Sequence, residues 1–250
     1  MLVNIFNSES IKLQGIAYYI GGYNYYDLNH NKNNFNSQDY NIIIDESAKQ
    51  NHWLYGHPLA VINLTTFKHN YEEYYSRLSK NVRRDIIISK KRNFYFKEFN
   101  INEFVNDFSE INFSQNKKKG SINPWYLKDP LSFKGMHSGY KHIWEDKQHY
   151  STWYGVFRHL KNYKQGNDTT HEKLLAYCKL AVDGEMATIT LFWGHADYFK
   201  YGIMFYMVSE IVKKIMSKSN IKCLLYYQMK QYSQWKSRML FEPIYIKIIL

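Results

Sequence analysis

The chain has 250 residues, 45% of them hydrophobic and 18% aromatic, which is enough for a core in one large domain or two small ones. It has only two cysteines, without motif spacing, which excludes a disulfide scaffold and favours a reducing location. No leader opens the sequence, and no apolar run reaches the roughly 18 residues that a membrane helix needs. We therefore expect a soluble, cytoplasmic protein without an integral membrane segment.

The net charge is +11, from 33 basic and 22 acidic residues. Such an excess favours polyanionic partners such as nucleic acid, phosphorylated carriers, nucleotide-linked substrates or anionic lipid surfaces. Heavy use of Asn, Lys, Ile and Tyr is also typical of an AT-rich genome, which raises the lysine content without any partner. The charge is therefore compatible with both interpretations.

Residues 1–60 carry the weakest patterns. The segment 23–40 is dominated by Asn, Asp and Tyr, which predicts an irregular loop. Two short strands are expected near it, at 40–44 and 59–64. No internal repeat is visible.

A helix is predicted to begin at Asn70. Asn70 followed by Glu73 has the form of a capping box, in which side chains satisfy backbone N–H groups of the first turn. Apolar residues then recur every four positions, and most of the lysines and arginines fall off that stripe, so the helix presents a basic face. The apolar stripe is Tyr74, Leu78, Val82 and Ile86, and the basic residues are Lys80, Arg83, Arg84, Lys90 and Lys91.

A strand at 94–99 and a second helix at about 102–112 follow. That helix carries Phe104, Phe108 and Ile111 at helical spacing. A basic loop at 114–135 comes next, with the triplet 117–119 of lysines and two prolines. Loops of this length in a compact domain are usually functional or mobile.

From residue 152 onward the pattern predicts strands at 153–160, 173–182 and 185–193. Asp183-Gly184 between the last two is a strong hairpin signal, and it predicts that Val182 faces Glu185 and Cys178 faces Ile189. The polar segment 162–170 is expected to be an exposed loop.

The rest of the chain predicts a helix at 198–217, a strand at 222–228, a short helix at 233–239 and a last strand at 244–249. A strand, a crossover helix and a second strand favour parallel pairing. The strands 185–193 and 222–228 should therefore be parallel neighbours.

His195 and Asp197 lie between the strand 185–193 and the helix that follows it. In open α/β sheets ligands collect at such ends, and histidine suits proton transfer there because its usual pKa is near neutral. The alternative is that Asp197 caps the helix while His195 bonds a loop carbonyl. Glu185, next to the tight turn, is a second candidate, with a simply solvated carboxylate as its alternative.

Other common sites find no support in the sequence. His137, His142 and His149 lack the spacing of a zinc site and have no cysteine beside them, so no metal is expected. No Walker loop, Rossmann fingerprint or Gly-x-Ser-x-Gly elbow is present.

The order of elements resembles the second half of a GNAT-type acyltransferase. The segment SKNVRRD at 79–85, followed by Lys90-Lys91-Arg92, is similar to the S-x-x-x-R-R-x-I-x-x-A-x-K helix of Fem-type aminoacyltransferases and their GNAT-like relatives, which are encoded with surface-polysaccharide genes. The ending WKSRMLFEP at 235–243 is similar to their K-x-x-x-G-F-x-P close, with Leu240 where glycine is usual. Segments 107–114, 149–157, 175–177, 194–197 and 202–204 are also similar, so the resemblance covers about residues 55–250.

This resemblance implies an α/β (α+β) GNAT-like fold: a mixed sheet with an antiparallel meander, a crossover helix and a parallel strand pair. It implies acyl or aminoacyl transfer to a sugar or other amine-bearing precursor of a cell-surface polymer, without a covalent enzyme intermediate and with a strand-edge N–H for the oxyanion. The catalytic residues would be His195, Asp197 and Glu185. The substrate-binding residues would be Arg83, Arg84, His149, Tyr154 and Lys236, and Tyr201 and Gly202 would bind the donor.

No tightly bound cofactor is implied, and the donor substrate would be acyl-CoA or aminoacyl-tRNA. In the Q/R-x-x-G-x-G/A loop of CoA-binding relatives, Gly202 would match the first glycine, but Phe199 and Met204 replace the basic and second small residue. Methionine there would obstruct a pyrophosphate, and the basic charge suits tRNA.

The resemblance divides the chain into an irregular segment 1–60, a basic helical part or degenerate first lobe at 61–150, and a core GNAT-like half at 151–250. Two alternatives stay open. The protein could be a non-catalytic module that binds nucleic acid or another polyanion. Arg83 and Arg84 could instead form only surface ion pairs with residues such as Glu72 or Asp107.

Overall fold

The structure is a computed structural model, and it describes residues 2–5, 9–12, 41–43, 59–115, 149–165, 168–183, 185–229, 233–244 and 247–249. Several expectations fall outside these residues. They are the loop at 23–40, most of the basic loop at 114–135 with its lysine triplet, His137 and His142.

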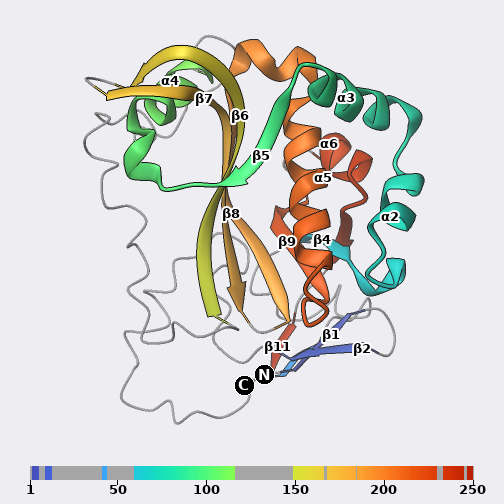
Figure 1. Ribbon diagram of the computed structural model, residues 1–250. Coiled ribbons are helices and arrows are strands. Elements are labelled where there is room, and N and C mark those ends of the chain that lie inside the picture. Colours follow the sequence, from blue (N-terminus) through green and yellow to red (C-terminus); the bar gives the residue numbers. More distant parts are fainter. Residues whose placement is uncertain are drawn as a thin grey trace, which may run out of the picture.

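A seven-stranded mixed sheet forms the centre of the molecule (Figure 1). Its order is β10 (Glu242–Ile244), β4 (Leu59–Asn63), β9 (Cys223–Gln228), β8 (Met186–Gly194), β7 (Asp168–Asp183), β6 (His149–Gln165) and β5 (Phe94–Glu98). Every pair is antiparallel except β8 with β9. The predicted meander and parallel pair are therefore confirmed. A small second sheet contains β11 (Lys247–Ile249), β3 (Asn41–Ile43), β1 (Leu2–Ile5) and β2 (Glu9–Lys12).

Helices cover both faces of the large sheet. The crossover helix α5 (Ile203–Met216) packs on one face, with α2 (Tyr71–Arg77) and α3 (Lys80–Lys91) outside it, and α4 (Val105–Gln115) lies on the other (Figure 1). The short helix α6 (Ser233–Arg238) follows β9. Among the residues that the structure describes, three 3-10 helices join these elements: η4 (Thr65–Phe67), η5 (Ile101–Glu103) and η9 (Ala196–Tyr201).

The predicted helix from Asn70 is two helices. Asn70 caps α2 as expected, since its side chain accepts hydrogen bonds from the N–H groups of Glu72 and Glu73. The chain then turns at Leu78, and Ser79 caps α3 by accepting a hydrogen bond from the Val82 N–H. The apolar stripe remains buried across the break, so the pattern identified the buried face correctly and missed the second cap.

The predicted register of the β7–β8 hairpin is wrong. Asp183 pairs with Met186, Val182 with Ala187 and Cys178 with Phe192. Glu185 lies in the connection, where its carbonyl accepts the N–H of Lys222 at 2.7 Å, so contact with the segment before β9 shifts the turn by one residue. The predicted loop at 162–170 is also wrong, because β6 extends to Gln165 and β7 begins at Asp168.

The turn after α6 explains the motif at the end of the sequence. Leu240 has a left-handed φ of 63°, and the N–H groups of Leu240 and Phe241 donate to the carbonyls of Ser237 and Lys236. This is a Schellman motif, whose left-handed position usually holds glycine because glycine has no Cβ penalty. The backbone thus adopts the left-handed conformation that the glycine of the K-x-x-x-G-F pattern favours, although this chain has Leu240 at that position.

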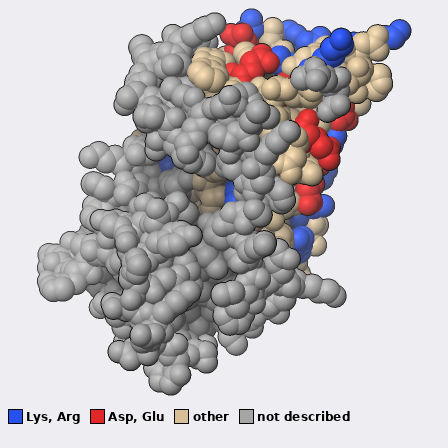
Figure 2. Space-filling model, turned by 90° about the vertical axis from the view of Figure 1, so that its left-hand side faces the viewer, with Lys and Arg blue, Asp and Glu red and all other residues tan. Residues whose placement is uncertain are grey.

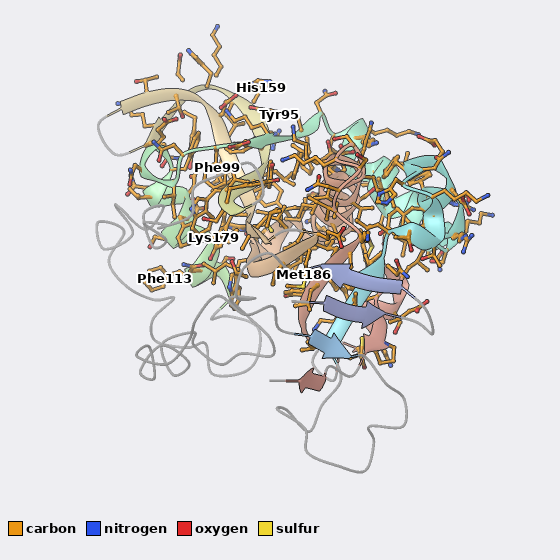
Figure 3. All side chains as sticks on the ribbon, turned by 90° about the horizontal axis from the view of Figure 1, so that it is seen from below. Tyr95, Phe99, Phe113, His159, Lys179 and Met186 are labelled. Carbon is orange, nitrogen blue, oxygen red and sulfur yellow. The ribbon has the colours of Figure 1, made fainter. Side chains whose placement is uncertain are left out.

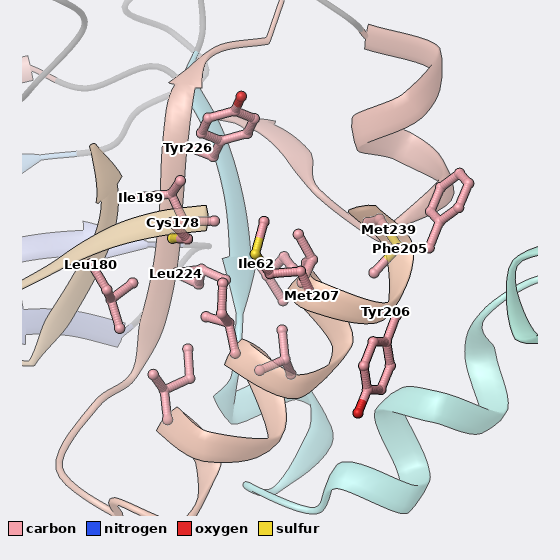
Figure 4. Packing of buried hydrophobic residues seen from close by; sticks show 14 of the residues in the cluster. Ile62, Cys178, Leu180, Ile189, Phe205, Tyr206, Met207, Leu224, Tyr226 and Met239 are labelled. Carbon is pink, nitrogen blue, oxygen red and sulfur yellow. The ribbon is translucent and has the colours of Figure 1, made fainter. Parts of the chain in front are cut away.

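The main core lies between the sheet and α5, α3 and α2 (Figure 4). It includes Ile62, Leu180, Ile189, Met207 and Leu224, all at most 1% exposed. Its residues come from both sides of position 150, so the segments that we assigned to 61–150 and 151–250 share one sheet and one core.

A second, largely aromatic core lies under α4. Phe108 stacks on Tyr177 with ring centroids 3.9 Å apart, and Phe104 and Phe157 meet edge to face at 5.1 Å. At the margin of this core Tyr95 and His159 stack at 4.4 Å, and they lie together in Figure 3. These contacts fix α4 on the sheet.

None of the helices in the described part of the chain combines the length and the apolar character that crossing a bilayer would require.

Candidate functional site

His195 follows the carboxyl end of β8 and caps η9. Its position depends on a bulge in β7: Val156 pairs with Ala176 and Phe157 with Leu174, which leaves Leu175 as an extra residue. The carbonyl of Leu175 accepts the backbone N–H of His195 at 2.8 Å. The irregularity therefore ties the end of β8 to β7.

A buried carboxylate supports the same bulge from α4. Asp107 is 1% exposed, and its Oδ2 accepts the N–H of Leu174 at 2.8 Å while the Tyr163 hydroxyl donates to its Oδ1 at 2.5 Å. Burial raises the pKa of Asp107, and the hydrogen bonds from Tyr163 and Leu174 oppose that shift. Asp107 thus fixes α4 against β7 next to the site.

Both ring nitrogens of His195 have partners. Nδ1 accepts the N–H of Asp197 at 3.3 Å, and Nε2 lies 3.1 Å from Oε1 of Glu110 on α4. Because Nδ1 accepts, a neutral ring carries its proton on Nε2 and donates it to Glu110. The arrangement is a carboxylate–histidine pair with a defined tautomer.

Glu110 is held in its ionised form. The hydrogen bond from His195 is the largest cause that lowers its pKa to about 2, and Lys173 lowers it further while desolvation opposes the shift. Lys173 Nζ lies 2.7 Å from each carboxylate oxygen. Glu110 therefore acts as an anion at neutral pH, with its side chain 45% exposed.

A pocket of about 790 Å³ opens beside this pair. Its wall comes from the end of α3, from β5, β6 and β7, from α4 and from η9. The lining residues are Ile88, Lys91, Arg92, Asn93, Phe94, Glu110, Arg158, Lys173, His195, Asp197, Tyr198, Lys200 and Tyr201. Five cations against two carboxylates make the pocket basic.

Aromatic rings order part of the wall. The guanidinium carbon of Arg92 lies 3.7 Å from the centroid of the Tyr201 ring, a cation–π contact. The Tyr201 ring meets Phe94 at 6.3 Å and Tyr198 at 6.2 Å, and the Ser89 hydroxyl donates to its carbonyl at 2.6 Å. Arg92 therefore rests on a ring that is itself fixed.

Three of the predicted site residues meet in this pocket: His195, Asp197 and Tyr201. Asp197 has a carboxylate that is 81% exposed, and its Oδ2 lies 3.9 Å from Nδ1 of His195. The carboxylate that orients the ring is that of Glu110, which accepts the hydrogen bond from Nε2–H of His195.

The predicted arginines do not line the pocket. Arg83 donates from Nη1 to the Ser76 carbonyl at 2.8 Å, and Arg84, 67% exposed, lies 3.6 Å from Asp85. The far end of the same helix supplies Lys91 and Arg92 instead. The predicted helix therefore supplies basic residues to the site, but the residues that line the pocket lie at its C-terminal end.

The other expected residues also lie elsewhere. Glu185 forms an ion pair with Lys222 at 3.0 Å, and Tyr154 is 3% exposed and stacks on Phe96 at 5.1 Å. Lys236 is 1% exposed, with Nζ 4.5 Å from the Tyr226 ring centroid, and burial lowers its pKa to about 8. The side chain of His149 lies outside the described residues. Glu185, Tyr154 and Lys236 do not line the pocket.

Gly202 serves helix packing. It has a φ of 74°, and a Cβ there would lie 2.5 Å from the Asp85 carbonyl oxygen of α3. Met204 fills the space beside Gly194, where a Cβ would lie 2.3 Å from its sulfur. Gly202 is thus packed closely against α3, which disfavours a pyrophosphate at that glycine.

The sequence interpretation missed Glu110, Lys173, Arg158 and Arg92. The sequence pattern could have indicated Glu110 as a candidate, since it lies on the polar side of the helix that carries Phe104, Phe108 and Ile111. No sequence pattern indicated Lys173 and Arg158, because only the pairing of β6 with β7 places them side by side.

Within the described ranges, no group of three or more His, Cys, Asp or Glu side chains is arranged to hold a metal ion.

The chain is similar in fold to several proteins of known structure. No family model and no curated protein matches the sequence. Among solved structures, FemX matches with a TM-score of 0.56 at 9% identity, covering 79% of this chain and 63% of that chain. The C-terminal domain of a putative lysylphosphatidylglycerol synthetase from Agrobacterium fabrum matches with a TM-score of 0.45 at 13% identity, covering 84% and 68%.

A tandem GNAT protein from the clavulanic acid biosynthesis pathway matches with a TM-score of 0.44 at 8% identity, covering 83% of this chain and 62% of that one. The chain thus spans less than two thirds of the FemX chain that it matches. At these identities the likeness concerns the fold alone: the chain has a GNAT-like mixed α+β fold that it shares with FemX.

Proposed function

We propose that the protein is an acyltransferase that moves an acyl or aminoacyl group to the amine or hydroxyl of a sugar or other amine-bearing precursor of a cell-surface polymer. The observation that carries the proposal is the carboxylate–histidine pair of Glu110 and His195 in the wall of a basic pocket. The fold shared with FemX and the ordered motifs that resemble Fem-type aminoacyltransferases support the same reading.

In this proposal His195 removes the proton of the acceptor. Glu110 holds the Nε2–H group, so the lone pair is on Nδ1, and among the described residues the hydrogen bond to it is the long 3.3 Å bond from Asp197 N–H. A histidine oriented by a carboxylate is a common device for general base catalysis. Glu110 is a positioning residue, because a carboxyl with a pKa of about 2 accepts protons poorly at neutral pH.

The acceptor then attacks the acyl carbonyl, and negative charge develops on the carbonyl oxygen. The ladder between β8 and β9 covers only Met186 to Thr188 paired with Cys223 to Leu225. Beyond Thr188 the two strands separate, and a backbone N–H along that edge of β8 is the proposed donor to the oxyanion. The tetrahedral intermediate then collapses, and the donor's oxygen or sulfur leaves as a free hydroxyl or thiol by taking the proton that His195 removed from the acceptor.

Acyl-CoA and aminoacyl-tRNA remain the two proposed donors, both of which would place the reaction in the cytoplasm. The packing of Gly202 against Asp85 disfavours a pyrophosphate at the start of α5, and the net charge of +11 suits a tRNA. We therefore favour aminoacyl-tRNA.

The test is a transfer assay with panels of acyl-CoA esters and aminoacyl-tRNAs as donors and amino sugars and nucleotide sugars as acceptors, read by mass spectrometry. His195→Ala should lower kcat by about 100-fold or more, the usual loss for a general base. Glu110→Gln should also lower kcat, because it removes the carboxylate that orients His195. Glu103→Gln, at an exposed carboxylate on η5, is the matched control. Full turnover of His195→Ala, with a folded circular dichroism spectrum, would refute the assignment.

A non-catalytic module that binds a polyanion is the second candidate, favoured by the excess of cations in the pocket. Such a module should bind RNA with an affinity that falls steeply with salt and that His195→Ala leaves unchanged. Turnover by the wild-type protein with any donor of the panel excludes it.

A further inference from the structure

We infer that the pocket takes a ligand with a diphosphate group, held by the side chains of Arg92 and Arg158 with help from Lys91 and Lys200. The inference rests on the proposed function only in naming the class of substrate, because binding can be tested without turnover. Four features support it. Four cations of the pocket have no carboxylate partner among the described residues, and the guanidinium of Arg92 is held against an aromatic ring. The cations come from separate elements, and Gly202 at the start of α5 is packed against α3.

The cations of the pocket fall into two groups. Lys173 is neutralised by Glu110, with both carboxylate oxygens 2.7 Å from Nζ. In the described part of the chain, no carboxylate lies within ion-pair distance of the other four cations, which are Lys91, Arg92, Arg158 and Lys200. Against these four stands one further carboxylate, Asp197, which leaves three positive charges, matching the two to three negative charges of a diphosphate ester.

The geometry of Arg92 suits a phosphate oxygen. Its guanidinium carbon lies 3.7 Å from the Tyr201 ring centroid, so the ring covers one face of the guanidinium plane. Stacking leaves the in-plane N–H groups free, and these make the two-pronged hydrogen bonds that arginine forms with phosphate. The stack also reduces the conformational freedom that arginine would lose on binding.

The remaining cations reach the pocket from different elements. Arg158 comes from β6, directly opposite Phe94 in the neighbouring strand, and Lys200 lies on η9 with Nζ 5.1 Å from the same Tyr201 ring. Arg92 and Lys200 thus share one ring with no anion between them among the described residues. A bound polyanion would relieve this repulsion.

This site is separate from the start of the crossover helix, where backbone N–H groups often bind phosphate. There the Asp85 carbonyl of α3 packs closely against Gly202, which disfavours a phosphate at that glycine. The side-chain cations at the end of α3, on β6 and on η9 are therefore the groups of this pocket that suit a phosphate.

The experiment measures the affinity for inorganic pyrophosphate by titration calorimetry at low salt, with orthophosphate and a nucleoside diphosphate as further arms. Wild-type protein should bind pyrophosphate and the nucleoside diphosphate more tightly than orthophosphate. The double variant Arg92→Gln/Arg158→Gln should lose at least tenfold in affinity, the effect of removing charged hydrogen bonds. The control Lys80→Gln/Lys214→Gln removes two exposed charges outside the pocket and should retain wild-type affinity.

Equal weakening in both double variants would mean that net charge alone attracts the anion, and it would overturn the inference. No binding of pyrophosphate by the wild-type protein would also overturn it. Tighter binding of orthophosphate than of pyrophosphate would show that the pocket prefers a single phosphate group, and it would refute a diphosphate ligand. Failure of the proposed transferase is distinguishable, because the wild-type protein would then show no turnover with any donor of the panel, whatever the pyrophosphate titration shows.

Discussion

Nε2 of His195 lies 3.1 Å from Oε1 of Glu110, although the two residues are 85 positions apart in the chain. The contact joins the end of β8 to α4 and places an ionised carboxylate in the pocket wall. Lysines and arginines also appear on the upper part of the described surface in Figure 2, interspersed with acidic residues.

Glu110→Gln should change the acid stability of the protein. The folded-state pKa of Glu110 is about 2 against an ordinary value of 4.5, so its charge stabilises the fold above about pH 4.5 and this contribution is lost as the pH falls toward 2. The difference in Tm between wild type and Glu110→Gln should therefore be largest at pH 6 and shrink between pH 5 and 2. Thermal melts over this range measure it, and a difference that is constant with pH would contradict it.

Lys236→Met should reduce the increase in the free energy of unfolding that the wild type shows as the pH rises above 8. Burial lowers the pKa of Lys236 to about 8 in the fold from 10.5, so the unfolded chain holds more protons than the folded one between these values. Stability should then rise with pH from about 8 to 10.5 in the wild type, and more weakly in the variant. Urea titrations at pH 7.5 and 9.5 test this, with exposed Lys80→Met as the control that should match the wild-type slope.

Gly202→Ala should destabilise the fold by about 2 kcal/mol or more, because the new Cβ meets the Asp85 backbone oxygen and the φ of 74° is unfavourable for alanine. Gly194→Ala should cost less, since the atom nearest to its Cβ is the sulfur at the end of a flexible methionine side chain. Chemical denaturation of both variants gives the comparison. A smaller loss for Gly202→Ala than for Gly194→Ala would show that the contact with α3 is not rigid.

Both cysteines should be inert in the folded protein. Cys178 and Cys223 are buried, and desolvation raises the pKa of each thiol, so little thiolate forms at neutral pH. A thiol reagent should modify neither residue under native conditions and both in denaturant. Rapid native labelling at a rate independent of denaturant would contradict the burial.

The sequence predicted the order of the elements because their patterns are local. The hydrophobic stripe through Tyr74 and Ile86, the Asn70 cap and the crossover from β8 to β9 follow from periodicity and from the geometry of short connections. The hairpin register was predicted wrongly because the contact of Glu185 with the chain before β9, distant in sequence, moved the turn. Local turn chemistry carries no information about that contact.

The sequence by itself determined that His195 lies at the junction between a strand and the crossover segment, and that α3 carries the basic residues. Only the tertiary structure decided which partners they meet. Glu110 orients His195 because the aromatic core under α4 and the Asp107 contact at the β7 bulge hold that helix against the sheet. Arg92 rather than Arg83 or Arg84 lines the pocket because the close packing of Asp85 on Gly202 sets how α3 lies along η9 and α5.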